Sequence, residues 1–240
     1  MLVSCSGKVS QNIHLQYGNP SHAQVSLNNY LIERPEYALS YNCAAGIANW
    51  VSWQLDSSWL GQVDRSNDFR PDSELPSKCY AVKPNDYRGS GYDRGHVVPS
   101  GDRTRRPEDN SATFIMSNII PQSPANNREV WRELEEYTRE LAQQGKEIYI
   151  VAGGSEIKAK IAQNQVVVPK YTWKVILILD PEAENNIATA SAIAVWIPND
   201  EEVARTDWQD YVLSVRELEA RTGFNFFDRL PKKLQQQIKL

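Results

Sequence analysis

The chain has 240 residues with 26 basic and 30 acidic side chains, which gives a formal net charge of −4 and a pI of about 5.5. Its length is sufficient for one large domain or two small ones, and a composition of 41% hydrophobic and 23% charged residues excludes a disordered chain. The longest wholly aliphatic run, residues 175–179, is too short to span a bilayer, so no transmembrane segment is predicted. The acidic balance alone argues against nucleic acid as a partner, because proteins that bind it are usually basic.

Residues 1–15 are polar and irregular and are predicted to form a flexible N-terminal tail, which leaves residues 16–240 as a single domain. Runs rich in aromatic and β-branched residues predict strands within 37–55, 113–120, 147–152, 171–179 and 188–197. Residues 181–186 form a predicted turn, so the last two strands are expected to make a hairpin. Residues 64–77 and 83–92 are rich in Pro, Gly, Asn and Asp and are predicted loops.

Two helices are predicted. Residues 126–144 carry an apolar stripe at i, i+4, i+7 and i+11 that begins at Val130 and ends at Leu141. Residues 207–222 carry a second apolar face, with Thr206 as a plausible N-cap. A glycine follows each helix and ends it. Hairpins mixed with a few helices indicate an α+β fold rather than alternating βαβ units.

The cysteines leave two questions open. Cys43 and Cys79 could form one disulfide or remain two separate buried thiols, and their spacing does not decide between these. Cys5 ends a Leu-Val-Ser-Cys run that resembles the lipobox of bacterial lipoprotein signals, although the basic and apolar regions that precede such a site are absent here. An exported protein, periplasmic or extracellular, with a lipoprotein-type signal ending near Cys5 is therefore one interpretation, and a chance match is the other.

Residues 92–99 read Tyr-Asp-Arg-Gly-His-Val-Val-Pro and contain the strongest candidate for chemistry. His96, beside a cation and a flexible glycine, is a candidate general base near an anionic substrate. The charge of Arg94 would oppose protonation of His96 and keep it able to accept a proton. The alternative is a structural histidine in a turn.

The predicted helix 126–144 carries a second candidate group. Asn127, Glu135 and Arg139 lie at multiples of four residues, and each step of four turns the direction by about 40°. Asn127 offers a neutral oxygen of the kind that magnesium accepts, Glu135 could hold the waters of that ion, and Arg139 could meet a phosphate. The alternative is an exposed helix face with a Glu–Arg ion pair.

The two segments together resemble the DNA/RNA non-specific endonucleases of the Serratia-nuclease type. The resemblance spans about residues 37–231, and its motifs are Asp-Arg-Gly-His at 93–96, Ser-Asn-Ile-Ile-Pro-Gln at 117–122, Asn127 followed by Trp131 and Leu-Glu at 134–135, and Thr-Gly-Phe at 222–224. It implies a central antiparallel sheet flanked by helices, with a ββα-metal motif at the active site.

The resemblance also implies roles for single residues. His96 matches the general base, and Asn127 matches the sole direct protein ligand of one Mg²⁺ or Mn²⁺ ion. Glu135 matches the carboxylate that hydrogen-bonds the waters of that ion. The neighbouring Asn126 leaves an off-by-one alternative for the ligand, which the family spacing resolves in favour of Asn127.

Four further residues are carried over from the family. Arg94 and Arg139 match arginines placed near the phosphate, and Arg65 matches an upstream phosphate-contacting arginine in a variable loop. Asp93, the first residue of the motif, is expected to orient the site rather than to bind the metal.

The implied activity is hydrolysis of DNA and RNA, single- and double-stranded, to products with a 5′-phosphate. A dedicated protein inhibitor is a further expectation from the resemblance. Two alternatives are a nucleic-acid-binding module with a decayed site and, because the chain has seven tryptophans, a β-rich carbohydrate- or protein-binding domain. Residues 83–106 contain six basic and three acidic side chains, so the acidic net charge does not exclude a local cationic surface for nucleic acid.

Overall fold

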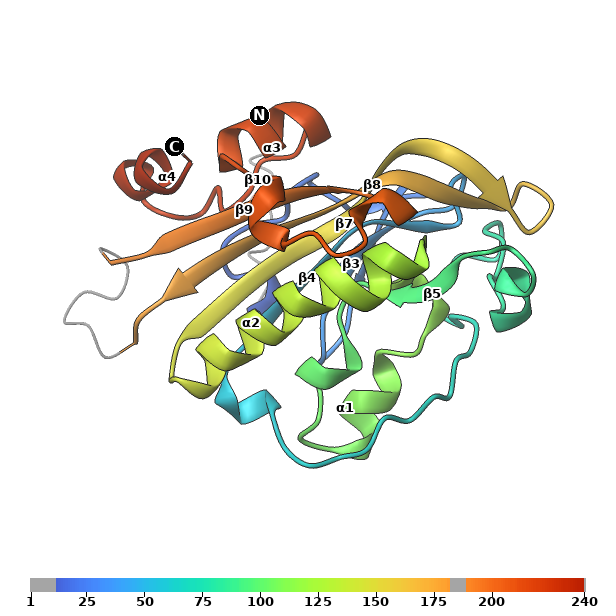
Figure 1. The fold of residues 1–240 in the computed structure, drawn as a ribbon, viewed down its shortest axis with the longest axis horizontal. Helices are drawn as coiled ribbons and strands as arrows, with labels where there is room; N and C mark the ends of the chain where they lie inside the picture. The colour runs from blue at the N-terminus through green and yellow to red at the C-terminus, as the bar shows by residue number, and fades with distance from the viewer. Residues whose placement is uncertain (1–11, 182–188, 240) are drawn as a thin grey trace, which may run out of the picture.

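A large antiparallel sheet forms the centre of the computed structural model, which describes residues 12–181 and 189–239 (Figure 1). In spatial order its strands are β1 (Val25–Ser26), β2 (Asn29–Glu33), β3 (Ala38–Asn42), β4 (Ile47–Leu55), β7 (Glu147–Ile161), β8 (Val166–Leu179), β9 (Ser191–Pro198) and β10 (Val212–Leu213). A separate pair is formed by β5 (Asp93–His96) and β6 (Ile119–Gln122), also antiparallel. The helices are α1 (Pro107–Ala112), α2 (Trp131–Gln143), α3 (Val215–Thr222) and α4 (Lys232–Ile238).

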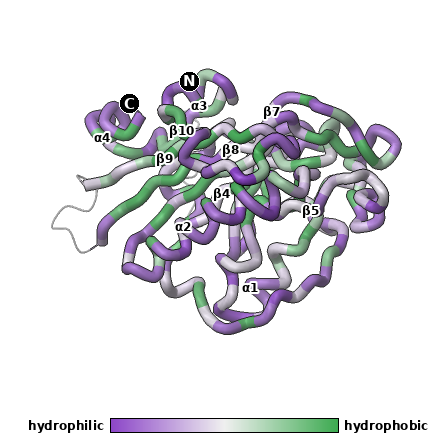
Figure 2. Tube along the Cα trace, in the orientation of Figure 1, coloured by the Kyte–Doolittle hydropathy of each residue, from purple (hydrophilic) through white to green (hydrophobic). Residues whose placement is uncertain are grey.

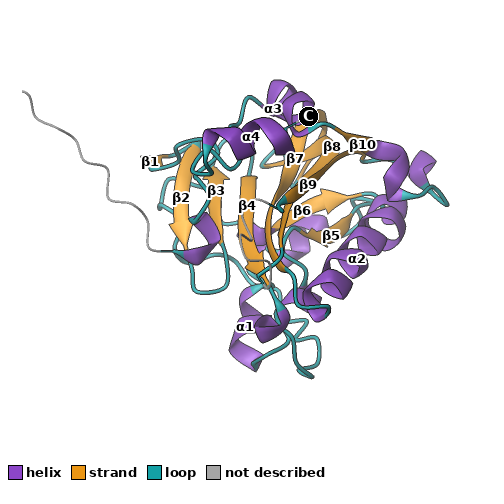
Figure 3. Cartoon of the chain, turned by 90° about the vertical axis from the view of Figure 1, so that its left-hand side faces the viewer, coloured by secondary structure: helices purple, strands orange, loops and turns teal. Residues whose placement is uncertain are grey.

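Two hydrophobic cores lie on opposite faces of the large sheet. On one face, Trp53 of β4 packs in a core with Trp131 of α2 and Ile120 of β6. On the other face, Trp173 of β8 belongs to a core with Leu218 of α3 and residues of α4. Figure 3 shows α2 and α3 on different sides of the strands, and Figure 2 shows hydrophobic stretches along the sheet with mostly hydrophilic loops around it. The predicted α+β class, with a central antiparallel sheet flanked by helices, is confirmed.

Most predicted strands are present, with one correction. The run 37–55 contains β3 and β4. The runs 147–152 and 171–179 correspond to the longer strands β7 and β8, and the run 188–197 corresponds to β9, which begins later, at Ser191. β8 and β9 pair antiparallel as expected of a hairpin, but residues 182–186 of the predicted turn lie outside the described residues. The strand predicted at 113–120 is wrong over most of its length. Its first residues form turns and a 3₁₀ helix, Met116–Asn118, and only Ile119–Gln122 is extended.

The second predicted helix is shorter than expected. Residues 208–211 form a 3₁₀ turn, and Val212–Leu213 then pairs with β9 as the edge strand β10. Because these two residues are extended, the helix begins only after them. The N-cap is Ser214, whose hydroxyl accepts a 3.1 Å bond from the Glu217 backbone N–H, and not Thr206. Gly223, with φ of +72°, ends the helix in the left-handed conformation as predicted.

The predicted tail extends too far into the chain. Residues 13–15 form a 3₁₀ turn in which His14 and Leu15 are buried, so the folded part includes residues assigned to the tail. His14 is fixed as a neutral ring: its Nδ1 accepts a 3.0 Å bond from the Gln54 backbone N–H, and its Nε2 lies 2.8 Å from the Pro35 carbonyl oxygen. Residues 1–11, Cys5 among them, lie outside the described residues.

Cys43 and Cys79 form a disulfide, which settles the alternative left open by their spacing. It ties the turn between β3 and β4 to the long segment that precedes β5. Six of the seven tryptophans are buried, which assigns them to core packing rather than to a carbohydrate-binding surface. No helix in residues 12–181 or 189–239 has the length and apolar character needed to cross a membrane.

We predict that His14 makes the fold sensitive to acid. Burial, and secondly the charge of Arg103, lower the pKa of His14 from 6.5 to about 3. Below about pH 6.5 the unfolded chain binds a proton that the folded chain does not, so the free energy of unfolding falls as the pH falls from 6.5 towards 3. In His14→Gln this dependence should become shallower by up to about 1.4 kcal/mol per pH unit.

Urea unfolding at several pH values measures this slope, and His22→Gln is the matched control because His22 is exposed. An unchanged slope in His14→Gln would contradict the prediction.

Candidate active site

The strand that carries His96 is held by the motif residues around it. Gly95 pairs with Ile120, and a Cβ at Gly95 would lie 1.8 Å from the Gln122 side-chain oxygen, so only glycine fits there. Directly after His96 the chain is fixed by Asn118, which accepts from the Val98 backbone N–H at 2.9 Å and donates to the Val98 carbonyl at 2.9 Å. These contacts explain the Gly and Asn positions of two motifs.

His96 is buried between aromatic rings. Its ring centroid lies 4.8 Å from that of Phe114, edge-on, and 5.4 Å from that of Phe69. Burial, followed by the charges of Arg65 and Arg94, lowers the pKa of His96 to about 3, so the imidazole is neutral near pH 7. Its Nε2 has no hydrogen-bond partner among the described residues, so the two phenylalanines, and no carboxylate, set the orientation of the ring.

A π-helical turn, Asn126–Val130, precedes α2. The side chains of the two consecutive asparagines at its start have different surroundings. Asn126 is completely buried: its amide nitrogen donates to Thr172 Oγ1 at 3.0 Å and to the Pro198 carbonyl at 2.9 Å. Asn127 is partly buried and lines the cavity described below. The side chain of Asn126 is therefore occupied by the sheet, and Asn127 is the asparagine that is available for binding.

Asp93 connects the start of β5 to the π-helical turn. Its Oδ2 accepts a 2.9 Å bond from the amide nitrogen of Asn127, and its two carboxylate oxygens accept bonds of 2.6 and 2.7 Å from Arg128. The Arg128 hydrogen bond is the main reason why the pKa of Asp93 lies below its usual value. Since the nitrogen of the Asn127 amide is held by Asp93, the amide oxygen is left for another partner.

Asp102 fixes the other end of the same helical segment. Its Oδ1 accepts from Arg139 of α2 at 3.0 Å, and its Oδ2 accepts from the Trp53 indole at 2.9 Å. Under α2, the Nζ atom of the buried Lys174 lies 4.1 Å from the ring centroid of Trp131. Burial raises the pKa of Glu135 and lowers that of Lys174, while the charge of each residue opposes the shift of the other.

One cavity of about 340 Å³ brings most of the predicted residues together. Its lining includes His96, Asn127 and Glu135 and all three predicted phosphate-binding arginines, Arg65, Arg94 and Arg139. Asp93 is not among its lining residues, although its carboxylate accepts from the amide nitrogen of Asn127, and the orienting role expected from the sequence stays a prediction.

Two of the arginines in the cavity are placed by aromatic rings. The guanidinium of Arg94 lies 4.2 Å from the ring centroid of Phe69, and that of Arg65 lies 4.9 Å from that of Phe114. Arg65 also donates a 2.8 Å bond to Ser100 Oγ. The rings that pack on His96 therefore also set where these cations lie.

The donors in this cavity fit a hydrated ion better than an enclosed one. Among the described residues no group of three or more His, Cys, Asp or Glu side chains could surround a metal. The side-chain oxygens at this cavity include the amide oxygen of Asn127 and the carboxylate of Glu135, whereas Glu136 is paired with Arg132 and Ser100 Oγ accepts from Arg65. Mg²⁺ usually keeps several waters and needs only one or two protein oxygens, so the two residues suit such an ion.

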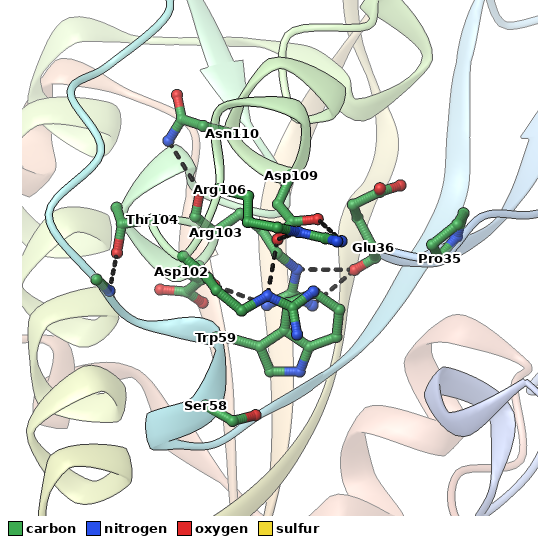
Figure 4. A network of polar contacts seen from close by, with 12 residues as sticks. Pro35, Glu36, Ser58, Trp59, Asp102, Arg103, Thr104, Arg106, Asp109 and Asn110 are labelled. Carbon is green, nitrogen blue, oxygen red and sulfur yellow. Dashed lines mark hydrogen bonds and ion pairs between the residues drawn. The ribbon is translucent and has the colours of Figure 1, made fainter.

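Three basic residues counted toward the local positive charge are structural. The fully buried guanidinium of Arg103 donates to the Glu36 carbonyl at 2.6 and 2.9 Å and lies 4.1 Å from the ring centroid of Trp59 (Figure 4). Arg105 and Arg106 both form ion pairs with the buried Asp109 at 2.9 Å. The count of basic residues could not show that Arg103 is buried and that the exposed Arg105 and Arg106 are already paired with a carboxylate.

Sequence reasoning also missed four residues of the site. Arg128 and Arg132 line the cavity, and Asp102 and Lys174 support it from inside. Lys174 gave a usable signal, because a lysine within an otherwise apolar strand is seldom buried without a partner. The contacts of Asp102 join residues far apart in the chain and have no local signature.

Comparisons with known proteins agree with this geometry. A family model described as DNA/RNA non-specific endonuclease matches residues 16–233. The chain is 47% identical to a nuclease from Nostoc sp., with 99% of this chain and 93% of that protein covered. It is 32% identical to Nuclease C1 from Cunninghamella echinulata var. echinulata, with 90% and 88% covered. The solved structure of EndoG in complex with EndoGI, which concerns inhibition of EndoG, matches with a TM-score of 0.78 and 26% identity over 92% of both chains.

The two asparagines should differ in their effect on stability. In Asn126→Ala, the groups that bond the Asn126 side chain, namely the Gln122 amide, Thr172 Oγ1 and the Pro198 carbonyl, lose that partner inside the protein. The free energy of unfolding should therefore fall by about 2 kcal/mol or more. Asn127→Ala should lower it by less than about 1 kcal/mol, because Asn127 makes one side-chain bond at the cavity edge. Urea denaturation of both variants measures the difference, and equal losses would contradict the assignment.

Proposed function

Because this chain belongs to the DNA/RNA non-specific endonuclease family, and is thus an endonuclease, we propose that it hydrolyses DNA and RNA, single- and double-stranded, to products with a 5′-phosphate. The observation that carries the proposal is the single cavity in which His96, Asn127 and Glu135 meet three arginines. None of these residues is needed to read base edges, and contacts to phosphate carry no sequence information.

His96 is the proposed general base. Its neutral imidazole takes a proton from the attacking water, which then adds to phosphorus in line with the leaving oxygen. The pKa of about 3 would make a weak base; burial is its main cause, and the charges of Arg65 and Arg94 lower it further. A phosphate between them brings negative charge beside the imidazole, which offsets their effect and raises the pKa of His96 towards neutrality.

The arginines of the cavity bind the phosphate and stabilise the additional charge of the transition state. Arg65, Arg94 and Arg139 approach the cavity from three segments of the chain, so they can contact different phosphate oxygens. Arg139 is held by Asp102 and Arg65 by Ser100 before any substrate binds. Little reorganisation is then required during the reaction.

Asn127 is the proposed direct ligand of one Mg²⁺ or Mn²⁺ ion, and Glu135 the acceptor for its waters. When bound, the ion supplies Lewis-acid stabilisation of the leaving oxygen. Asp93 holds the amide nitrogen of Asn127 and so turns the oxygen towards the ion. Glu135 lies on α2 two turns after Asn127, and its half-buried side chain lines the cavity together with Arg139.

An inhibitor and export remain parts of the proposal. The match to EndoG, which was solved with EndoGI, supports a dedicated protein inhibitor for this chain, and the Cys43–Cys79 disulfide supports an oxidising compartment. Cell fractionation and an inhibition assay with fractions of the source would test them. A chain confined to the cytosol, or fractions without inhibitory activity, would count against them.

Two substitutions test the chemistry. With Mg²⁺, the wild-type protein should degrade supercoiled plasmid and single-stranded RNA, and EDTA should abolish both activities. His96→Ala should lower both rates at least roughly a thousandfold, because the proton acceptor is lost. Asn127→Ala should raise the Mg²⁺ concentration that gives half-maximal rate, and should weaken Mn²⁺ binding measured by electron paramagnetic resonance.

His22→Ala is the control for His96→Ala because the imidazole of His22 is exposed and outside the cavity. Full activity of His96→Ala would overturn the mechanism, and unchanged Mn²⁺ binding in Asn127→Ala would overturn the metal assignment. A wild-type chain that binds nucleic acid but cleaves none with either metal would favour a binding module.

A further inference from the structure

A second, larger cavity of about 610 Å³ adjoins the reactive one. The two cavities share three lining residues, Arg65, Arg94 and Asn127, so they form one continuous depression. The volume lies within the roughly 300–1,000 Å³ range of small-ligand sites. None of the chemistry derived above uses the far part of this second cavity.

The far part offers groups that suit a nucleotide. Tyr92 and Arg88 line it together with the amide of Asn85, and neither Arg88 nor Asn85 has a hydrogen-bond or ion-pair partner for its side chain among the described residues. Arg88 is exposed, and Tyr92 is half-buried. An aromatic ring and an unpaired cation that line the same cavity are the usual combination in sites that stack a base and bind its phosphate.

The wall that carries these groups is fixed before any ligand binds. Tyr87 is buried beneath it, and its hydroxyl donates to the Ile119 carbonyl of β6 at 3.4 Å. Ser90 Oγ donates to the Tyr87 carbonyl at 2.7 Å and accepts from the Tyr92 backbone N–H at 3.2 Å. The turn between them passes through Gly89 and Gly91, with φ of +71° and +81°. These contacts fix the backbone of the loop at Tyr92, which lowers the entropic cost of binding there.

The charge of the cavity also favours a nucleic acid strand. Arg65, Arg88 and Arg94 contribute three positive charges to its lining, whereas Asp93, the acidic residue there, is already paired with Arg128. When the scissile phosphate of a nucleic acid lies between Arg65 and Arg94, the neighbouring nucleotide must occupy space beside these arginines. The second cavity is the adjoining space with both cationic and aromatic groups.

We propose that this cavity is a nucleotide subsite for the unit next to the scissile phosphate, with Tyr92 stacking on its base and Arg88 binding its distal phosphate. The proposal rests on the proposed function and assigns this site to one neighbouring nucleotide of DNA or RNA. Stacking accepts every base, so the subsite adds affinity without sequence preference.

The test compares two substrates of different length. Bis(p-nitrophenyl) phosphate carries neither a nucleobase nor a second phosphate, whereas a single-stranded DNA hexanucleotide carries both and is long enough to reach the second cavity. In Tyr92→Ala and Arg88→Gln, the ratio of kcat/KM for the hexanucleotide to that for the small diester should fall about tenfold, mainly through KM. Tyr92→Phe should restore the ratio, because it keeps the ring.

Binding is measured separately, by fluorescence anisotropy of a labelled hexanucleotide in EDTA, where no cleavage occurs. The Kd should rise about tenfold in Tyr92→Ala and several-fold in Arg88→Gln. Arg216→Gln is the matched control, because Arg216 is an exposed arginine of α3, which packs on the opposite face of the sheet. Circular dichroism confirms that each variant is folded.

The outcomes separate the two levels of the proposal. A wild-type protein that hydrolyses both substrates, with variants that keep the wild-type ratio and Kd, overturns the subsite and leaves the proposed function intact. A wild-type protein that hydrolyses neither overturns the proposed function. Equal losses on both substrates would also overturn the subsite, because Tyr92 and Arg88 would then act on the reactive cavity itself.

Discussion

The reactive geometry depends on two carboxylates that hold one helical segment against the strand of His96. Asp93, three residues before His96, binds Asn127 and Arg128, and Asp102, six residues after it, binds Arg139. Neither carboxylate is placed to react; core packing places the helix, and the two carboxylates fix the side chains of Asn127 and Arg139 on it. Side chains held in such ion pairs lose their conformational freedom when the protein folds. This entropy cost does not then arise during catalysis, so the active site is preorganised.

The net charge of −4 does not show that the arginines have different roles, some in the fold and some at the cavity. Arg103 has a structural role, because its guanidinium donates hydrogen bonds to backbone carbonyls that would otherwise be buried without partners. Arg65 and Arg94 are held on aromatic rings instead of carboxylates, so their charge remains available to an anion. A count of basic residues along the sequence cannot separate these roles, because burial and pairing decide them.

The sequence predicted those parts of the site that depend on local spacing. The helical stripe from Val130 to Leu141 placed Glu135 and Arg139 correctly on α2, and the ββα-metal motif implied by the resemblance agrees with His96 at the end of β5. What it could not predict came from contacts between distant residues. The π-helical turn that directs Asn126 inward, the early start of the β10 edge and the pairing of Asp102 with Arg139 all depend on tertiary packing.

The claim that Asp102 acts by positioning Arg139 is tested most directly by a double-mutant cycle on kcat/KM for a single-stranded oligonucleotide. Asp102→Asn keeps an acceptor for the Trp53 indole but removes the charge that binds Arg139. The account predicts that Asp102→Asn lowers kcat/KM about tenfold in the wild-type background and less than about twofold in the Arg139→Gln background, because residues that act as a unit are not additive. If the two losses multiply, Asp102 acts independently of Arg139 and the account is contradicted.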